Sequence, residues 1–482
     1  MGQIPMVSAI RHWASHTGSR PALTVEDTTL TFEELDLLTE RAGHELVRLG
    51  VQRGDRVTVA LPNSIEFIVA SIAILKVGAA IQPISHRLPL VERQAIVDLV
   101  APSLIIGADA SEHPDRRCAS HITTGPATKS APLPDVVSEI WKITTSGGTT
   151  GQPKLIITTT PAVIDLDAKP DYLLPARGVV LIPGPLYHTA PFTQSLLALF
   201  HGNHVILEKR FDAATTMQRL ERYRVNFVLL VPTMMSRIWK LPANERDRDL
   251  SSLTTVFHMA ASCPVWLKQA WIDWLGPDRI FELYGASDSP ANTIISGSEW
   301  LKHRGSVGRA SFGEICIMDS DGHSLAPSEI GEIWMRPPAG MPSRAQVVGA
   351  NSGQRDGWTT VGDLGWMDSD GYLYIADRRT DMIVTGGENV YSAEVEAALD
   401  RHQGVLSSAV IGLPDDDLGQ RVHAVVEVAE GVTEQDLRHH LAEQLDRYKT
   451  PRTYELTRRP LRDDAAKVRK SELIQQRLNT AP

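Results

Sequence analysis

A run rich in glycine and hydroxyl side chains, residues 143–154, is the part of the chain whose residue types best suit chemistry. It contains five serines or threonines and three glycines, and it ends in Pro153 and Lys154. Glycine lets a backbone approach a ligand closely and adopt positive φ, so the N–H groups and hydroxyls of such a loop can face a polyanion. Lys154 adds a mobile positive charge suited to a phosphate. The run predicts a binding loop for a nucleotide polyphosphate, with a surface linker as the alternative. It is not a Walker loop, because Pro153 precedes the lysine and Leu155 follows it.

Composition narrows the class of protein that carries this loop. The chain has 482 residues, 42% of them apolar and 22% charged, and a net charge of 48 − 58 = −10. This is typical of a globular protein with two or more domains and argues against a nucleic-acid binder. Cys118, Cys263 and Cys316 lie far apart, which favours a reducing compartment and excludes a cysteine metal site. The longest apolar run, 67–75, is too short to cross a bilayer, and the start lacks the pattern of a secretion signal. We expect a cytoplasmic protein that binds no membrane.

Alternating strand and helix patterns predict the scaffold of the first half. Thr31 and Glu34 form a capping pattern at the start of an amphipathic helix over 30–50. The pattern continues as a strand at 55–61, a helix at 64–77 and a strand at 79–84, and it returns between 178 and 259. Such alternation favours an α/β fold with a mostly parallel sheet.

The predicted secondary structure changes twice in the second half of the chain. Short alternating runs between 305 and 376 predict a small β-barrel or sheet, with a turn-rich loop at 336–357. From 379 onward the chain reads as α+β, with helices at 393–399 and 433–447 and strands at 406–411 and 422–427. We therefore expect an N-terminal domain at 1–378 and a C-terminal domain at 379–482.

Six segments, in order, resemble one family, the adenylate-forming enzymes, which include acyl-CoA synthetases, firefly luciferase and the adenylation domains of peptide synthetases. The segments are 30–85, 144–154, 185–191, 284–289, 360–396 and 463–473. The chain looks closest to the acyl- or aryl-CoA ligases. The resemblance implies a large domain of two αβαβα subdomains plus a β-barrel, and a small mobile α+β domain. It also implies ATP, Mg²⁺ and coenzyme A as cofactors: a carboxylate forms an acyl adenylate, and a thiol then displaces AMP.

The resemblance assigns a nucleotide site. The implied members are Ser146, Gly148, Thr149, Thr150 and Lys154 for the phosphates, Asp363 and Arg378 for the ribose side, Ser262, Cys263, Tyr284, Gly285 and Ser287 around the base, and Asn389. Three of these residues have a structural role as the alternative: Asp363 as a turn cap, Arg378 as a surface charge and Tyr284 as a core aromatic.

The resemblance also implies three catalytic residues. Lys467 would bridge the carboxylate and the α-phosphate, His188 would lie at the acyl pocket, and Asp288 would hold Mg²⁺. A solvated lysine and a helix-capping histidine are the alternatives. The chain departs from the family pattern at five places: Gly147, Ser287–Asp288, the hinge residue Thr380, Val384 and Ala465–Ala466.

The segment 188–194 carries no acid to pair with the ammonium of an amino acid, which makes an amino-acid substrate unfavourable. The candidate pocket walls are apolar with small members: Tyr187, Phe192, Met234, Met259, Ala260 and Ala286. They suit an aryl, medium-chain fatty or polycyclic carboxylic acid. Transfer of the acyl group to coenzyme A is the first hypothesis. Loading of a phosphopantetheinyl carrier protein and a catalytically silent nucleotide- or acyl-binding protein are the alternatives.

Overall fold

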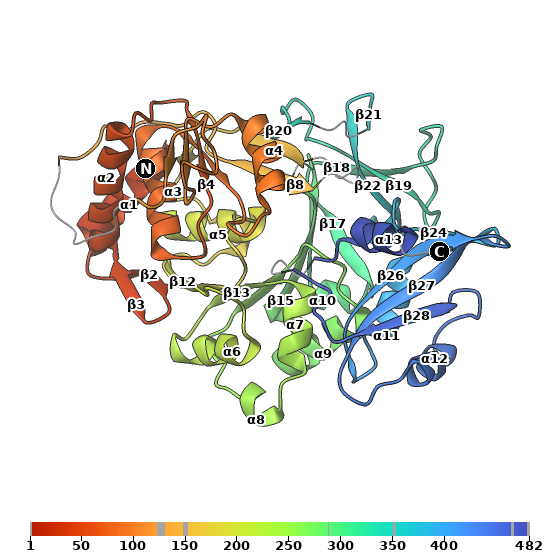
Figure 1. Ribbon diagram of the computed structural model, residues 1–482. Helices are drawn as coiled ribbons and strands as arrows, with labels where there is room; N and C mark the ends of the chain where they lie inside the picture. The colour runs from red at the N-terminus through yellow and green to blue at the C-terminus, as the bar shows by residue number, and fades with distance from the viewer. Residues whose placement is uncertain are drawn as a thin grey trace.

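The computed structural model describes residues 2–122, 131–147, 153–287, 289–349, 353–463 and 467–479. It consists of a large N-terminal α/β domain and a small C-terminal α+β domain (Figure 1). Within the described ranges, no helix combines the length and the apolar character needed to cross a bilayer.

Local signals fix the first helices. Helix α2 (Phe32–Arg48) begins at the predicted capping box, in which Thr31 accepts from the Glu34 backbone and Glu34 accepts in return from that of Thr31. Helix α3 (Ile65–Val77) begins at Ser64, whose hydroxyl caps the Phe67 N–H, and it ends at a left-handed glycine. Helix α3 is buried along its length, as its apolar run predicts. Helix α1 (Met6–Thr17) packs on α2 and α5.

Two parallel sheets form the predicted α/β core. The smaller has the order β5 (Ala80–Pro83), β4 (Arg56–Val59), β6 (Leu104–Ile106), β7 (Cys118–Ala119). The larger contains the parallel run β2 (Pro21–Val25), β12 (His204–Leu207), β11 (Val179–Ile182), β13 (Phe227–Leu230), β14 (Thr255–His258), β15 (Ile280–Tyr284). The connecting helices are α5 (Thr189–Phe200), α6 (Ala213–Arg222), α7 (Pro232–Trp239) and α9 (Val265–Leu275). Because the strands are parallel, the segments that follow β11, β14 and β15 leave from one edge of the sheet.

The strands expected as a barrel or sheet extend this large sheet. The antiparallel members are β16 (Asn292–Ser296), β17 (Ser306–Phe312), β23 (Leu373–Arg378), β22 (Trp358–Met367), β19 (Gly331–Arg336) and β18 (Glu314–Met318). For the part of the chain described, their pairing is open rather than closed on itself.

The expected loop at 336–357 is partly wrong. It contains β20 (Ala345–Val348), which pairs with β9 (Pro153–Thr158) and through it with β8 (Ile143–Gly147), and β21 (Gln354–Arg355). A short strand without internal periodicity is fixed by its distant partner, here about 190 residues away in sequence, rather than by local pattern.

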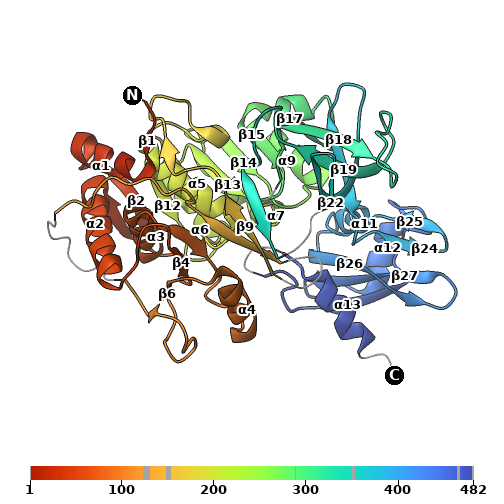
Figure 2. The same ribbon diagram turned by 90° about the horizontal axis from the view of Figure 1, so that it is seen from above.

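The small domain has its own core and a five-stranded sheet. The sheet comprises β25 (Glu388–Val390), β24 (Ile383–Thr385), β27 (Gly419–Val428), β26 (Val405–Asp415) and β28 (Thr453–Thr457), with helices α11 (Ser392–Leu399), α12 (Glu434–Ala442) and α13 (Lys470–Leu478). Figure 2 shows this domain lying beside the large one, with α13 against β26. Among the contacts that join the domains, Lys240 Nζ donates to the Val405 carbonyl at 2.5 Å, and Arg469 pairs with Glu92 at 3.2 Å.

Candidate active site

Three of the expected nucleotide-site residues come together where β15, β22 and β23 meet. Tyr284, the last residue of β15, donates its hydroxyl to Asp363 Oδ2 at 2.7 Å. Asp363 lies opposite Arg378 in the β22–β23 register, and Arg378 Nε is 3.6 Å from Asp363 Oδ1. Burial and the Asp363 carboxylate raise the pKa of Tyr284 well above its usual value, so the phenol stays a donor. The result is a fixed carboxylate with a cation beside it, an arrangement that fits a ribose next to a phosphate.

Lys467 of the small domain enters this region. Its backbone is held in a tight turn, because the Lys467 N–H donates to Asp463 Oδ1 at 3.0 Å and the Asp463 N–H donates to the Lys467 carbonyl at 3.0 Å. Burial, and then the positive charge of Arg378, lower the pKa of Lys467. Lys467 is exposed, and its charge acts on Arg378 and His188 of the large domain. The amine therefore lies on the side of the small domain that faces these two residues.

The charge of Lys467 also acts on His188. It immediately precedes α5, and its side chain makes no capping hydrogen bond. Burial and the Lys467 charge lower the pKa of His188 to about 3, so the ring is neutral. In the described part of the chain the buried Nε2 has no hydrogen-bond partner, and the ring of Tyr187 packs against His188 at 4.4 Å. A buried, unsatisfied imidazole nitrogen beside a cationic amine is a feature that a bound ligand can satisfy.

The segment after β15 is tied to the start of α5. Ser287 donates to Thr189 Oγ1 at 2.8 Å, and Ala286 and Ser287 are both exposed. Gly285 has little room for a side chain, because a Cβ added there would lie 3.2 Å from the Cβ of Asn292. Asp288 lies outside the described residues, so the metal assignment stays a prediction.

The segment after β14 contains two of the expected nucleotide-site residues. Ser262 is exposed and Cys263 half-buried, and burial raises the pKa of the Cys263 thiol. Ala260 has φ of 74°, a left-handed conformation that costs a residue with a Cβ about 1–3 kcal/mol. Such strain is commonly found at functional sites.

The glycine-rich run begins in the hairpin of β8 and β9. In its register Ser146 lies opposite Lys154. Gly148, Thr149 and Thr150 lie outside the described residues, so their phosphate contacts stay predictions.

The expected pocket walls do not form one open cavity. Phe192 is completely buried against Phe67 and Trp141, with ring centroids 6.1 and 6.3 Å away, so the structure places it in the core. Met234 and Met259 are also buried, whereas Ala260 and Ala286 are exposed.

The expected hinge residue Thr380 and the expected nucleotide-site residue Asn389 lie in the small domain. Thr380 follows β23 and donates to Asp381 Oδ1 at 3.1 Å. Asn389 is exposed on β25, opposite Val384 on β24.

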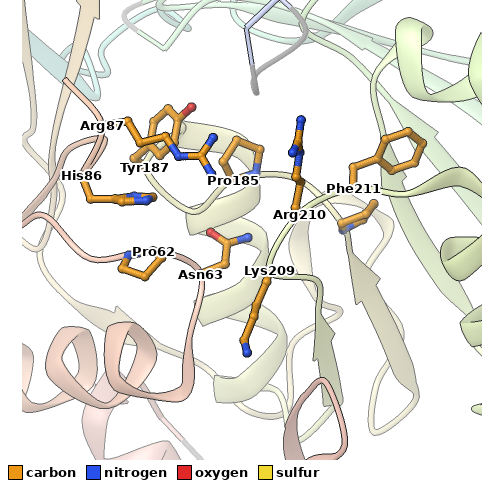
Figure 3. Close-up of a pocket in the computed structure, with 10 residues that line it drawn as sticks. Pro62, Asn63, His86, Arg87, Pro185, Tyr187, Lys209, Arg210 and Phe211 are labelled. Carbon is orange, nitrogen blue, oxygen red and sulfur yellow. The ribbon is translucent and has the colours of Figure 1, made fainter. Parts of the chain in front are cut away.

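A cationic recess that the sequence did not predict lies beside Tyr187 (Figure 3). It encloses about 410 Å³ of space that is open to solvent, and three of its side chains are basic: Arg87, Lys209 and Arg210. Asn63 ties its walls together, because Asn63 Nδ2 donates to the carbonyls of Gly184 and Glu208 at 3.0 and 2.8 Å. Figure 3 shows Arg87 and Arg210 on opposite sides of Pro185.

Comparison with known proteins supports the resemblance to the adenylate-forming enzymes. A family model described as "AMP-binding enzyme" matches residues 10–343, and one described as "AMP-binding enzyme C-terminal domain" matches residues 394–462. A feruloyl-CoA synthase from an Amycolatopsis species is 31% identical over 92% of this chain and 94% of its own length. A 3-[(3aS,4S,7aS)-7a-methyl-1,5-dioxo-octahydro-1H-inden-4-yl]propanoyl:CoA ligase from Mycobacterium tuberculosis is 30% identical over 96% of both chains.

The fold also matches solved structures. The o-succinylbenzoate CoA synthetase of Bacillus subtilis, in complex with its acyl-adenylate intermediate, superposes with a TM-score of 0.83 over 98% of both chains at 24% identity. The same synthetase has been solved with ATP and a magnesium ion, and that structure superposes with a TM-score of 0.81 at 24% identity over 98% of this chain and 99% of its own. The chain belongs to the AMP-binding enzyme family and is an AMP-forming acid–thiol ligase.

Proposed function

We propose that the enzyme activates an apolar carboxylic acid (aryl, medium-chain fatty or polycyclic) as its acyl adenylate and transfers the acyl group to coenzyme A. The observation that supports this proposal is that the charge of Lys467, from the small domain, interacts with His188 and Arg378 of the large domain, and that Arg378 is next to the Tyr284–Asp363 pair. The relatives named above act on acids of this range, from feruloyl to a polycyclic diketone.

The first half-reaction joins the carboxylate to the α-phosphorus of ATP, while the bond from that phosphorus to pyrophosphate breaks. Both reactants are anionic, so the site must offset their repulsion and align them. We assign this role to Lys467, whose charge meets the negative charge that builds between the two reactants. Asp363 and Tyr284 hold the ribose, and Arg378 adds a second cation. Mg²⁺, when bound, neutralises charge on the polyphosphate; Asp288 is the residue that we propose to hold it.

The second half-reaction joins the thiol sulfur to the acyl carbon, while AMP leaves with the electron pair of the carbon–oxygen bond. The cationic recess favours coenzyme A as the thiol, because Arg87, Lys209 and Arg210 match the phosphates of its nucleotide end. A carrier protein would present a single phosphodiester. We place the domain boundary between Arg378, where β23 ends, and Arg379, so that the small domain can turn between the half-reactions.

The test is isotope exchange between pyrophosphate and ATP across a panel of carboxylic acids, followed by detection of the thioester with coenzyme A or with a phosphopantetheinylated carrier. We expect acid-dependent exchange and a coenzyme A thioester. In Arg87→Ala and Arg210→Ala the KM for coenzyme A should rise about tenfold, the value of one charge-assisted contact, with exchange unchanged. Thioester on the carrier alone would move the assignment to carrier loading. An absence of exchange with every acid would leave only a silent binding protein.

A further inference from the structure

A lysine outside the site described above is half-buried and has no carboxylate partner among the described residues. Lys142 immediately precedes β8, and its Nζ donates to Thr193 Oγ1 at 2.6 Å. An ammonium has three donors, and among the described residues Thr193 is the one hydrogen-bond partner that Lys142 contacts. Burial alone lowers the pKa of Lys142 to about 8.

Two lysines with little exposed surface among the described residues are neutralised. Lys76 pairs with Asp36 and Glu40 at 2.7 Å each, and Lys268 pairs with Glu282 at 2.5 Å. Taking an ammonium out of water without such a partner costs several kcal/mol, so buried cations are normally paired. Within the described ranges Lys142 makes no ion pair. This contrast indicates that its partner is something other than this chain.

The hydrogen-bond partner of Lys142 lies on α5, the helix that His188 precedes. Thr193 and Thr189 are one helical turn apart on the same face of α5, and Thr189 accepts the hydrogen bond from Ser287. The Thr193 hydroxyl that Lys142 contacts is therefore about one turn, ~5 Å along the helix, from the contact with the segment that follows β15. Lys142 is half-buried, so part of its surface is open to a ligand.

The wall around this amine is apolar. Nζ lies 4.7 Å from the ring centroid of Trp141, which stacks on Phe192 at 6.3 Å. Gln194, the next residue of α5, also has a buried side-chain oxygen with no partner among the described residues. A ligand that reaches this point contacts an apolar surface that carries one cation.

We infer that Lys142 determines specificity: it binds an oxygen acceptor, a carboxylate or a ketone, at the end of the substrate remote from the reacting carboxylate. The inference rests on the proposed function and narrows its substrate class, from an apolar acid to an apolar acid with a polar far end. Lys467 meets the reacting carboxylate, and Lys142 meets the remote oxygen. Recognition of this oxygen selects strongly, because a substrate without it leaves a buried cation unsatisfied.

The experiment compares acids matched in length: octanoic acid, 7-oxooctanoic acid and octanedioic acid, with 3-phenylpropanoic and 3-(4-carboxyphenyl)propanoic acids as an aryl pair. Pyrophosphate exchange gives kcat/KM for each acid, and thermal shift without ATP gives binding. In the wild type we expect the oxygen-bearing member of a pair to be preferred at least about tenfold, as for one hydrogen bond to a charged group. The two arms of the octanoic series show whether the acceptor is a ketone or a second carboxylate.

Lys142→Met keeps the length of the side chain and removes the charge, so the preference should reverse in favour of the plain acid. Lys142→Gln keeps a donor without the charge and should retain part of a ketone preference but none for the diacid. Thr193→Val, the matched control, removes the hydroxyl but keeps the charge of Lys142, and it should keep the wild-type preference. Because each result is a ratio within one variant, a general loss of stability cancels.

Equal ratios in wild type and Lys142→Met, in exchange or in binding, would overturn the inference and leave the proposed function intact. Failure of exchange with every acid, with a binding preference that still depends on Lys142, would overturn the function and keep the specificity role.

Discussion

The hydrogen bond from Lys240 to the Val405 carbonyl is expected to hold the small domain in the orientation that brings Lys467 near His188 and Arg378. Lys240 follows α7 of the large domain, and Val405 is the first residue of β26 in the small domain. Lys240→Met keeps the apolar stem and removes the donor. The variant should therefore destabilise this orientation relative to the one that serves the second half-reaction.

The size of the effect follows from the geometry. A hydrogen bond from a charged group contributes about 1.5–3 kcal/mol. Lys240 keeps much of its surface exposed, and solvent screening reduces the contribution to ~1 kcal/mol. The equilibrium between the orientations should shift by about fivefold. When the domains exchange rapidly, the ratio of the two half-reaction rates follows this equilibrium.

The assay measures each half-reaction alone. Adenylate formation is followed as pyrophosphate release in a single turnover without coenzyme A, and thioester formation starts from synthetic acyl adenylate. In Lys240→Met the ratio of the second rate to the first should rise about fivefold. Arg469→Gln is the control, because its pair with Glu92 is 46% and 44% exposed and should change the ratio less than about twofold. An unchanged ratio in Lys240→Met, or an equal fall in both rates, would refute the reasoning.

Three further changes have defined outcomes. Tyr284→Phe removes the 2.7 Å hydrogen bond to Asp363 and should raise the KM for ATP about five- to tenfold in exchange assays, with the thermal midpoint nearly unchanged; a KM equal to that of the wild type would contradict this. The pKa of His188 is about 3 because the ring is buried, so His188→Asn should leave the shape of the pH–rate profile between about pH 5 and pH 9 unaltered, and loss of an acidic limb would show that His188 titrates there. Burial raises the pKa of Glu208 from 4.5 to about 7, so the folded protein binds the extra proton and the stability it contributes is present below pH 4.5 and lost as pH rises through 7. Glu208→Gln should accordingly show a smaller fall in unfolding midpoint from pH 5 to pH 8 than the wild type, and an equal fall would argue against the shift.

Elements with strong local signals could be predicted from sequence. The Thr31–Glu34 capping box and the left-handed Gly78 after α3 act within one turn of chain, so residue type alone fixes them. The sequence did not predict strand β20. This four-residue strand lies in a turn-rich segment and is stabilised by pairing with β9, which is remote in sequence. Local pattern could not supply that pairing.

The candidate site likewise combines residues that the sequence could identify with contacts that it could not. Tyr284, Asp363 and Lys467 carry motifs that the family resemblance identified, but the hydrogen bond between Tyr284 and Asp363 spans 79 residues and no spacing predicts it. The recess residues Arg87 and Arg210 are 123 positions apart (210 − 87) among many other basic residues, so they show no signal until the fold brings them together. Lys142 reads in sequence as an ordinary strand-end lysine, and only its burial without a carboxylate distinguishes it.

The most direct test of the account is the rate of acyl-adenylate formation in Lys467→Ala, measured beside thioester formation from supplied acyl adenylate. We predict a fall of at least about a hundredfold in the first rate, as for the loss of a group that stabilises transition-state charge, and a second rate within about twofold of the wild type. Equal rates of adenylate formation in variant and wild type would contradict the role assigned to this lysine.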